Sequence, residues 1–517
     1  MDRRLFMKSG FAASAVGMMG FNSRSSHAFA PPTFNDYKAL ICLFLHGGND
    51  SWNTFIPIGA SGNSSYGTYS DQRSSLAVAN SPINFSFTGA LEKGEGNPYY
   101  AKGDTKASYL KGYYPIDGIP DVGVNALMPE FAHLLQNKKA SLVADVGTLV
   151  EPISNRAEYE AIIKGQVSKQ IPLFLFAHNH QQRILQTGRA DSLHATGWAG
   201  RIADLWDGLH AANGLGINVS LRDQKRMMIG RQTQPVILRP GSILSFAGMN
   251  DTSKTAHVNR RNLFQALTGE KPENRPFIKI YNDMLGRSIE ISDLLLSNWE
   301  KKSDFSGVKG PYGEDLFAVP TSADLGLDED LDGDLITQLE AVAQLISIGS
   351  SSSAMNLKRQ IFFVNYGTFD HHGDQTSEHP TKLRELSLSI WKIQKALQHL
   401  GVQDKVALFT LSDFGRTMSN NGDGTDHAWS TMNAIVSETP SFGGGKMHGS
   451  LPDLRMGGDS DSGSKGRFIP KIAVEQVGAG LCRWFGIQNS ELSTIFPNLE
   501  KFKTGSGIET SYIQGLI

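Results

Sequence analysis

The sequence predicts an α/β fold with a mainly parallel central sheet covered by helices on both faces. Three observations support this prediction. Continuous apolar runs recur along the chain, as expected for strands that are buried on both sides. Segments with apolar residues at helical spacing alternate with these runs. Several runs end in histidine and aspartate, which is typical of the carboxyl edge of a parallel sheet, where ligands bind.

The predicted strands are uninterrupted rather than alternating apolar runs. They cover residues 39–48, 140–147, 171–179, 359–370 and 405–415. Helical patterns cover residues 127–139, 198–209, 335–350, 382–401 and 472–486. Within 382–401, Leu383, Leu386, Ile390 and Ile393 recur at helical spacing, and Gly401 suits the position that follows a helix. Strands and helices that alternate in this way favour a mainly parallel sheet.

Charge and cysteine content exclude some classes of function. The chain has 517 residues, with 49 Lys+Arg against 51 Asp+Glu and a formal net charge of −2. This balance gives no electrostatic reason to expect nucleic acid or an anionic membrane as a partner. The two cysteines, Cys42 and Cys482, are too few for a cysteine-based zinc site. Cys42 lies inside the first apolar run, so we expect a buried free thiol there; one disulfide is the alternative.

The first thirty residues are predicted to be a twin-arginine (Tat) export signal. Arg3 and Arg4 precede a weakly apolar segment from Phe11 to Phe21, and Ala30 provides a small residue for cleavage. An ordinary export signal with a chance arginine pair is the alternative. No other segment approaches the ~18–20 apolar residues that span a bilayer. We therefore expect the Tat translocon as a partner during export, no integral membrane segment after cleavage, and a periplasmic or secreted protein.

Residues 31–517 are predicted to form a single domain with two loop insertions. The first insertion lies near 60–120 and is rich in Ser, Gly, Asn and Tyr. The second lies near 440–467 and is rich in Gly, Ser and Asp. Both compositions are typical of surface loops, and the total of 54 glycines agrees with long loops.

Groups that bind metals or move protons follow four of the predicted strands. They are Asp50, His178, Asp370, His372, Asp413, Asp426 and His427. Because the carboxyl ends of parallel strands meet at one edge, the clustered carboxylates would repel each other unless a cation or protons offset their charge. Mixed imidazole and carboxylate ligands suit zinc, manganese or iron, whereas all-oxygen coordination would favour calcium or magnesium. The sequence therefore predicts a divalent metal site, with zinc or manganese favoured.

Each of these residues also has a purely structural interpretation. Asp50 could form an Asx turn after the two glycines that precede it. Asp413 could form an ion pair with Arg416, and His178 could be a solvated loop histidine. Asp426 could cap a turn in its glycine-rich segment. The sequence leaves these alternatives open.

Seven motifs resemble, in this order, the bacterial family called domain of unknown function 1501, in the alkaline-phosphatase-like (sulfatase-like) superfamily. They are FLHGGNDSWNTFIP, DVGTLVEP, LFAHNHQQRILQTG, GWAGRIADL, NYGTFDHHGDQ, LSDFGRT and NGDGTDHAW. Together with the export signal they span almost the whole chain. The resemblance implies an alkaline-phosphatase-like α/β fold: a central sheet, helices on both faces, and a two-metal site at the strand ends.

The resemblance also implies roles for the clustered residues as metal ligands. The implied ligands are Asp50 after the first strand, the pair Asp370 and His372, Asp413, and the late histidine His427 with Asp426 beside it. Phe414 stands where the superfamily has a histidine, so one ligand position is missing.

The catalytic residues follow less directly from the resemblance. The nucleophile would be Ser154 or Thr148, or else water activated by the metal. His178 would act as a general acid or an outer ligand, and Arg416 would neutralise the substrate anion. The sulfatase signature C/S-x-P-S-R is absent from the sequence, which disfavours a true sulfatase.

Three functional hypotheses follow, and the sequence leaves open whether the protein is an enzyme. The first is an exported metal-dependent hydrolase or transferase acting on phosphate or sulfate esters of small molecules or glycans. The second is a non-catalytic, degenerate member of the fold that acts in envelope assembly or polysaccharide binding. The third is a carbohydrate-active enzyme with paired carboxylates. Its candidate sugar-stacking residues are Trp52, Tyr99, Tyr100 and Trp429.

Overall fold

The computed structural model describes residues 32–83, 109–210, 215–240, 253–269 and 275–517. The predicted export signal, residues 1–30, lies outside these ranges, and so does much of the predicted insertion near 60–120. Within them, no helix is both long and apolar enough to cross a membrane. The export route therefore stays a prediction from the sequence.

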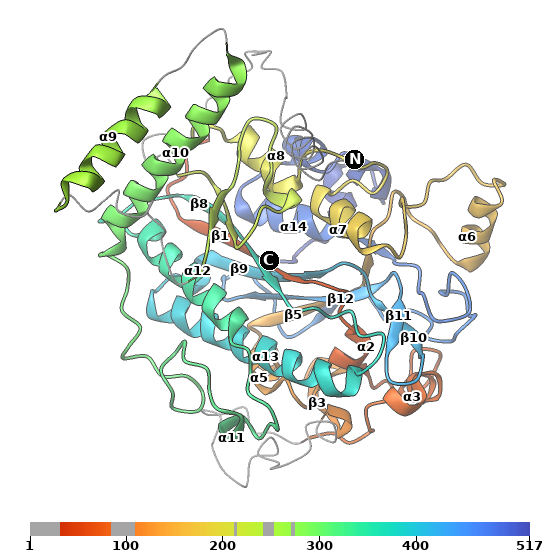
Figure 1. Ribbon diagram of the computed structural model, residues 1–517. Coiled ribbons are helices and arrows are strands. Elements are labelled where there is room, and N and C mark those ends of the chain that lie inside the picture. Colours follow the sequence, from red (N-terminus) through yellow and green to blue (C-terminus); the bar gives the residue numbers. More distant parts are fainter. Residues whose placement is uncertain (1–31, 84–108, 211–214, 241–252, 270–274) are drawn as a thin grey trace, which may run out of the picture.

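A mixed sheet of nine strands forms the centre of the described part of the chain (Figure 1). Its path runs β13-β5-β12-β9-β1-β8-β6-β7, and β14 pairs with β5. The strands are β1 (Lys38–Leu45), β5 (Ala140–Gly147), β6 (Asn218–Leu221), β7 (Val236–Leu238), β8 (Arg359–Tyr366), β9 (Val406–Ser412), β12 (Thr431–Ser437), β13 (Met447–His448) and β14 (Ile472–Ala473). All pairings are parallel except those of β12 with β5 and β9. The predicted α/β class with a mainly parallel sheet is confirmed.

Helices cover both faces of the sheet (Figure 1). Ile41 and Leu43 of β1 pack in one core with α5 (Pro129–Gln136), α12 (Asp334–Ser350) and α13 (Gln375–His399). Leu40, Cys42 and Phe44 point to the opposite core, which holds α8 (Trp198–Leu205) and α14 (Val474–Phe485). This alternation follows from the two-residue period of a strand, and it explains why β1 is apolar at every position from Ala39 to Leu45. Cys42 and Cys482 are buried free thiols, as expected for Cys42.

The remaining elements surround this layered core. Two smaller sheets are β2 (Phe55–Pro57), β3 (Tyr113–Ile116) and β4 (Ile119–Asn125), and the hairpin β10 (Arg416–Asn420) with β11 (Thr425–His427). The other helices are α2 (Ser51–Thr54), α3 (Tyr66–Arg73), α6 (Arg156–Ile163), α7 (His178–Thr187), α9 (Thr255–Gly269), α10 (Pro276–Trp299), α11 (Ser322–Leu325) and α15 (Leu492–Ile495). The hairpin β10–β11 follows β9 directly, so it extends the carboxyl edge of the sheet.

The prediction of a strand over residues 171–179 is wrong. The segment is a turn that leads into α7, which begins at His178. Phe174 and Phe176 have positive φ angles, 50° and 71°, which no extended strand allows. The apolar run was mistaken for a strand because run length alone cannot separate a buried strand from an apolar turn.

The segment 440–467, predicted as a loop insertion, is organised around one buried carboxylate. Asp461 accepts hydrogen bonds from the backbone N–H groups of Gly457 (2.8 Å), Gly463 (2.9 Å) and Gly466 (2.8 Å). β13 is the one strand within the segment. The loop therefore has a polar centre in place of an apolar core.

Strand β5 carries a buried carboxylate whose pKa is strongly perturbed. Burial raises the pKa of Asp145 to about 7, and the hydrogen bond that Ser430 Oγ donates to Oδ1 at 2.6 Å offsets this only in part. In the unfolded chain the group titrates near its ordinary value of 3.8. Between these values the native protein binds a proton that the unfolded chain has released. The free energy of unfolding should therefore fall as the pH rises through this window and level off above it.

Asp145→Asn should remove this pH dependence, because asparagine keeps the acceptor oxygen but does not ionise. Since one pKa unit corresponds to about 1.4 kcal/mol, the contribution of Asp145 between pH 5 and pH 8 should be on the order of 2–3 kcal/mol. Urea unfolding at both pH values measures the difference. The exposed Asp404→Asn is the matched control and should keep the wild-type slope. If the free energy of unfolding of Asp145→Asn fell between pH 5 and pH 8 as it does in the wild type, another group would be the cause of the pH dependence.

Candidate metal centre

The candidate site lies where the carboxyl ends of β1, β8 and β9 meet the hairpin β10–β11 and the start of α7. Asp370 follows β8, Asp413 follows β9, His427 ends β11 and His178 begins α7. The close approach of the segment after β1 to the segment after β8 requires a glycine at position 47. A Cβ there would lie 2.6 Å from the backbone nitrogen of Phe369, and φ is +104°.

Three imidazole Nε2 atoms surround one carboxylate oxygen. The Nε2 atoms of His178, His372 and His427 lie 3.2, 3.1 and 3.1 Å from Oδ1 of Asp370. Nε2 of His427 also lies 2.9 Å from Nε2 of His178 and 2.9 Å from Nε2 of His372. The ligand atoms of His178, Asp370 and His427 all lie within 4.8 Å of one another. We call these three residues the His–Asp cluster.

Hydrogen bonds to the Nδ1 atoms orient the two histidines of the cluster. Nδ1 of His178 lies 2.6 Å from Oδ2 of Asp413, and Nδ1 of His427 lies 2.8 Å from the carbonyl oxygen of Phe176. In the neutral imidazole, a proton on Nδ1 leaves the lone pair of Nε2 facing Asp370. A carboxylate or carbonyl behind the ring is the usual arrangement for a metal-binding histidine.

Asp413 also carries a polar atom without a partner. Its Oδ2 accepts from Gln182 Nε2 at 2.8 Å and from the backbone N–H of Gly47 at 3.2 Å. Its Oδ1 is buried, and no group in the described part of the chain hydrogen-bonds to it. A buried carboxylate oxygen without a partner is costly unless a proton or a cation satisfies it.

The donor set fits a divalent transition metal. The spacings of 2.9–3.2 Å among the donor atoms are close to the about 3.3 Å edge of a tetrahedron with zinc–ligand bonds of 2.0–2.1 Å. Two imidazole nitrogens and one carboxylate oxygen suit zinc or manganese better than calcium or magnesium, which prefer oxygen ligands. The residues of the His–Asp cluster could therefore hold one such ion.

The electrostatics of the cluster favour a cation. Partial burial acts to raise the pKa of Asp370, but Arg416 and His178 hold it well below its ordinary range, so the carboxylate is ionised. Burial lowers the pKa of His427, which keeps this imidazole neutral near pH 7. Burial also acts to lower the pKa of His178, but Asp413 and Asp370 together raise it above its ordinary value. An anionic oxygen next to a neutral imidazole is the protonation state that binds a metal.

Arg416 was predicted to neutralise the substrate anion, but the structure does not place it for that role. Its side chain is buried and every guanidinium nitrogen is engaged. It donates to the carbonyls of Gly47 (3.0 Å), Gly48 (2.9 Å), Phe369 (2.8 Å) and Thr425 (3.1 Å), and to Oδ1 of Asp370 (2.6 Å). Arg416 thus ties the ends of β1 and β8 to β11 and positions Asp370, and it is not free to bind an anion.

Asp50, a predicted metal ligand, is instead paired with groups that lie outside the His–Asp cluster. Its carboxylate is buried and forms an ion pair with Arg73, which is itself fully buried. Oδ2 also accepts from Gln375 Nε2 at 2.5 Å, and Oδ1 accepts from the backbone N–H of Trp52 at the start of α2 (3.2 Å). With these partners Asp50 does not belong to the His–Asp cluster.

The two predicted nucleophiles also have other partners. Thr148 is buried, and its hydroxyl donates to Oε1 of Gln181 at 2.7 Å. Ser154 is exposed before α6, where its backbone N–H donates to Glu158 at 2.6 Å. In the described part of the chain, neither hydroxyl is hydrogen-bonded to the His–Asp cluster.

His372 and Asp426 lie at the exposed rim of the site. The His372 side chain is 46% exposed, and its Nδ1 lies 3.4 Å from Oδ1 of Asp426. Oδ2 of Asp426 is paired with Lys465 at 3.1 Å, and the Lys465 side chain is largely exposed. Of the predicted site residues, the structure thus brings His178, Asp370, His372, Asp413, Asp426 and His427 together.

Comparison with known families matches one part of the chain. Residues 353–449 match the family described as Protein of unknown function (DUF1501). The predicted family is confirmed over these residues. The DUF1501 segment carries Asp370, His372, Asp413, Asp426 and His427, but not His178 or Asp50. No curated protein matches the sequence.

Three solved structures are similar to this chain at 9% sequence identity. Ps i-CgsB, solved in complex with k-i-k-neocarrahexaose, has a TM-score of 0.34, with 90% of this chain and 78% of that chain covered. The PsFucS1 sulfatase from Pseudoalteromonas sp. has a TM-score of 0.32, with 88% and 68% covered. BT1596, a 2-O GAG sulfatase, has a TM-score of 0.27, with 87% and 71% covered. At these TM-scores the likeness says nothing about activity.

Sequence reasoning missed Gln182, and it noted Phe414 only as a replaced histidine. Gln182 lies one helical turn after His178 on α7, and this spacing of four residues could have placed both on the same face. Phe414 in the DUF1501 segment packs its ring on His178 and His427, with centroids 4.5 and 4.6 Å apart. The ring that replaces the expected histidine thus fills the space beside the cluster instead of donating to a metal.

Asp413→Asn should lower the affinity for zinc by about 10- to 100-fold, because it removes the charge behind His178 without removing a cluster residue. Competition with a fluorescent zinc chelator measures the affinity. Glu438→Gln is the control: Glu438 is a half-buried carboxylate that pairs with Lys139 and is not part of the site, so this variant should bind zinc as the wild type does. Equal zinc affinity in Asp413→Asn and the wild type would argue against the orienting role.

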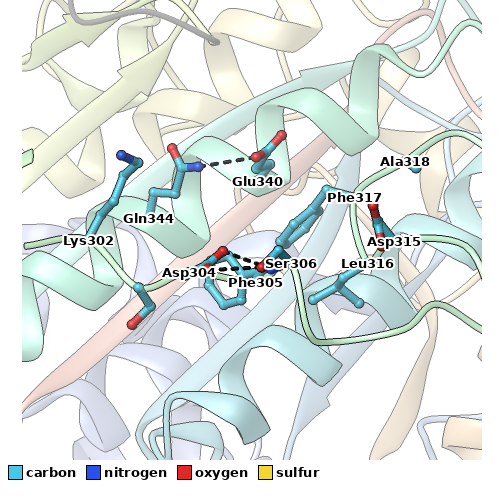
Figure 2. Close-up of a pocket in the computed structure, with 11 residues that line it drawn as sticks. Lys302, Asp304, Phe305, Ser306, Asp315, Leu316, Phe317, Ala318, Glu340 and Gln344 are labelled. Atoms are coloured by element: carbon cyan, nitrogen blue, oxygen red, sulfur yellow. Dashed lines mark hydrogen bonds between the residues drawn. The ribbon is translucent and has the colours of Figure 1, made fainter. Parts of the chain in front are cut away.

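The structure also contains cavities away from this site. One of about 470 Å³ lies beside α12 and is lined by Asp304, Phe305, Phe317, Glu340 and Gln344, among others (Figure 2). Gln344 donates to Glu340 at 3.1 Å within it. The described residues that line it include neither histidine nor cysteine, so they form no set of metal-binding side chains comparable with the His–Asp cluster.

Proposed function

We propose that this protein is an exported metal-dependent hydrolase or transferase that acts on phosphate or sulfate esters. The observation that carries the proposal is the convergence of the Nε2 atoms of His178 and His427 on Oδ1 of Asp370, with Asp413 behind His178. Oriented imidazoles around a carboxylate at the carboxyl edge of a mainly parallel sheet are the arrangement expected of a catalytic metal centre. The twin-arginine signal predicted from the sequence supports a periplasmic or secreted location.

The residues of the site would divide the work as follows. His178, His427 and Asp370 would hold one ion, zinc or manganese by the nature of the ligands. When bound, this ion would supply Lewis-acid polarisation of the ester oxygen. Arg416 and Asp413 would fix Asp370 and His178 in place. Since neither the Ser154 nor the Thr148 hydroxyl is hydrogen-bonded to the cluster within the described residues, the attacking group would be water rather than a side-chain hydroxyl.

His372 is the candidate proton donor to the leaving group. It lies at the rim, nearly half exposed, with Asp426 near its Nδ1 and Asp370 near its Nε2. A histidine in this position can reach both solvent and an ester bound at the cluster. The sequence hypothesis gave His178 the role of a general acid or an outer ligand. The contact between Nδ1 of His178 and Asp413 orients its Nε2 toward Asp370 and favours a ligand role, so the acid role passes to His372.

Metal analysis and turnover test the proposal together. The full chain would be purified from the periplasm, its zinc and manganese content measured by mass spectrometry, and nitrophenol release followed from 4-nitrophenyl phosphate and 4-nitrophenyl sulfate. We expect about one metal equivalent per chain. We also expect turnover that a chelator removes and added metal restores. Protein that carries no metal and releases no nitrophenol from either ester would overturn the proposal.

One observation favours the non-catalytic alternative. Oδ1 of Asp370 already pairs with Arg416 at 2.6 Å, so the cluster can satisfy its charge without a metal. The site would then be a structural polar network in a protein that acts in envelope assembly or polysaccharide binding. The same metal analysis separates the two, because this alternative requires neither a bound ion nor turnover.

A further inference from the structure

Residues 461–467, which we call the rim loop, have a backbone that is fixed against the hairpin β10–β11. The buried carboxylate of Asp461 accepts hydrogen bonds from the backbone N–H groups of Gly466 (2.8 Å) and Arg467 (3.0 Å). The backbone N–H of Met418 on β10 donates to the carbonyl of Gly466 at 3.2 Å. Glycine is required at position 466, because φ is +72° and a Cβ there would lie 2.3 Å from Cβ of Met418. The rim loop therefore presents its side chains from a defined backbone position.

Lys465 of the rim loop is joined to the site through one carboxylate. Its Nζ lies 3.1 Å from Oδ2 of Asp426, whose Oδ1 lies 3.4 Å from Nδ1 of His372. Among the described residues Asp426 is the one hydrogen-bond partner of this ammonium, which has three N–H donors. The Lys465 side chain is 57% exposed, and an ion pair in water is weak. Lys465 can therefore pair with a second anion.

Arg467 of the rim loop contacts the His–Asp cluster directly. Its Nε donates to the carbonyl oxygen of His427 at 2.9 Å. Its Cζ lies 4.6 Å from the centroid of the Phe176 ring, and the carbonyl of Phe176 lies 2.8 Å from Nδ1 of His427. Within the described part of the chain, the two Nη atoms have no hydrogen-bond partner, and the residue is only half-buried. In contrast to the fully engaged Arg416, Arg467 thus keeps donors that can bind an oxyanion.

The two cations lie on the outer side of the imidazoles. An ester bound at the metal would lie at the Nε2 atoms of His178 and His427, which face Asp370. Lys465 lies beyond Nδ1 of His372, with the Asp426 carboxylate between them, and Arg467 meets the main chain of His427. Neither cation is therefore placed to bind the ester group that is cleaved. They are placed to bind a group of the same substrate that lies farther out.

We propose that Lys465 and Arg467 form an anion subsite at the rim, and that it selects esters whose substrate carries a second acid group. Two cations against the one carboxylate of Asp426 leave a positive rim, which favours an anion. The second group can be a carboxylate, a sulfate or a phosphate, because each offers oxygen atoms to an ammonium and a guanidinium. This inference rests on the proposed function, since it names the substrate class for that site.

Binding of phosphonates tests the subsite separately from turnover, because their P–C bond is not hydrolysed. The probes are benzylphosphonates with a carboxylate at ring position 3 or 4, each compared with the neutral carboxamide of the same shape. They would be titrated calorimetrically into the full chain purified from the periplasm. We expect at least one carboxylate to bind about tenfold more tightly than its carboxamide. Equal affinity within both pairs, or no binding of any probe, would overturn the subsite.

Lys465→Met is the decisive variant, because a largely exposed side chain can be replaced without loss of the fold. It should reduce the preference for the carboxylate, and the double variant with Arg467→Gln should abolish it. Lys309→Met is the matched control: the Lys309 side chain is 59% exposed and pairs with Asp315, so this variant should keep the preference.

Two outcomes separate this inference from the function on which it rests. A preference for the carboxylate that survives in the double variant refutes the subsite, even if the protein turns over nitrophenyl esters. A preference that depends on Lys465 and Arg467, in a protein that releases no nitrophenol, supports the subsite and refutes only the proposed hydrolase.

Discussion

Asp370→Asn should remove bound metal and reduce ester turnover by more than about 100-fold, the upper end of the cost of losing an outer partner of a metal site. Three imidazole nitrogens face Oδ1 of this carboxylate, so the substitution removes the one charge at the centre of the cluster. It also leaves Arg416 without its anionic partner. The positive charge of Arg416 is then uncompensated, and it repels a metal ion at the cluster. Metal content by mass spectrometry and nitrophenol release measure the two effects.

Asp315→Asn is the matched control for this experiment. Asp315 is an exposed carboxylate paired with Lys309, far along the chain from the cluster residues, and its loss should change neither metal content nor turnover. The Asp370 side chain is 40% exposed, so the variant is expected to fold, and circular dichroism would confirm this. A full metal equivalent in Asp370→Asn would rule out this carboxylate as the centre of the site.

The sequence was sufficient to predict the sheet and its functional edge. β1, β8 and β9 are buried on both faces, and for this reason their sequences are continuous apolar runs that can be recognised without a structure. The polar residues after them must gather, because parallel neighbours end at the same edge. Asp370 and Asp413 were therefore predictable as neighbours from topology alone, whereas His427 ends β11, which belongs to a separate hairpin.

The sequence was not sufficient to predict which partner each polar group would choose. Asp50 follows β1 as a ligand would, but α3 carries Arg73 into the same buried space. The segment that contains α3 has the composition of a surface loop, so nothing in its pattern predicted a buried arginine. In the same way, the carbonyl groups that engage Arg416 come from three separate segments and are defined only by the folded chain.

The backbone strain at Phe174 and Phe176 could not be predicted from the sequence either. The run before His178 contains alternating Leu and Phe residues, which satisfy the pattern of a buried strand. Its φ angles are set by the amide of Gln181 and by contacts with β11, which are tertiary interactions. β12 was also missed: it follows the polar hairpin β10–β11 directly, and it is antiparallel to both of its neighbours, β5 and β9.

Arg73→Met should lower the free energy of unfolding by about 3–5 kcal/mol, the usual cost of breaking a buried ion pair. Arg73 is fully buried, and it donates to Asp50, to Asn53 Oδ1 at 3.1 Å and to the carbonyl of Thr417 at 2.6 Å. Burial lowers the pKa of Arg73 to about 10, so the guanidinium is still charged at neutral pH. Methionine fills much of the space but leaves the Asp50 carboxylate buried without a cation. Urea unfolding measures the loss.

The double variant Asp50→Asn with Arg73→Met separates the ion pair from the metal site. Because it removes both charges, it should recover part of the stability lost in Arg73→Met. Asp50→Asn alone should be destabilised but should still bind a full metal equivalent, since Asp50 is not part of the His–Asp cluster. If Asp50→Asn instead lost its metal as Asp370→Asn does, Asp50 would be a ligand, as its position after β1 first indicated, and the pairing with Arg73 would be secondary to that role.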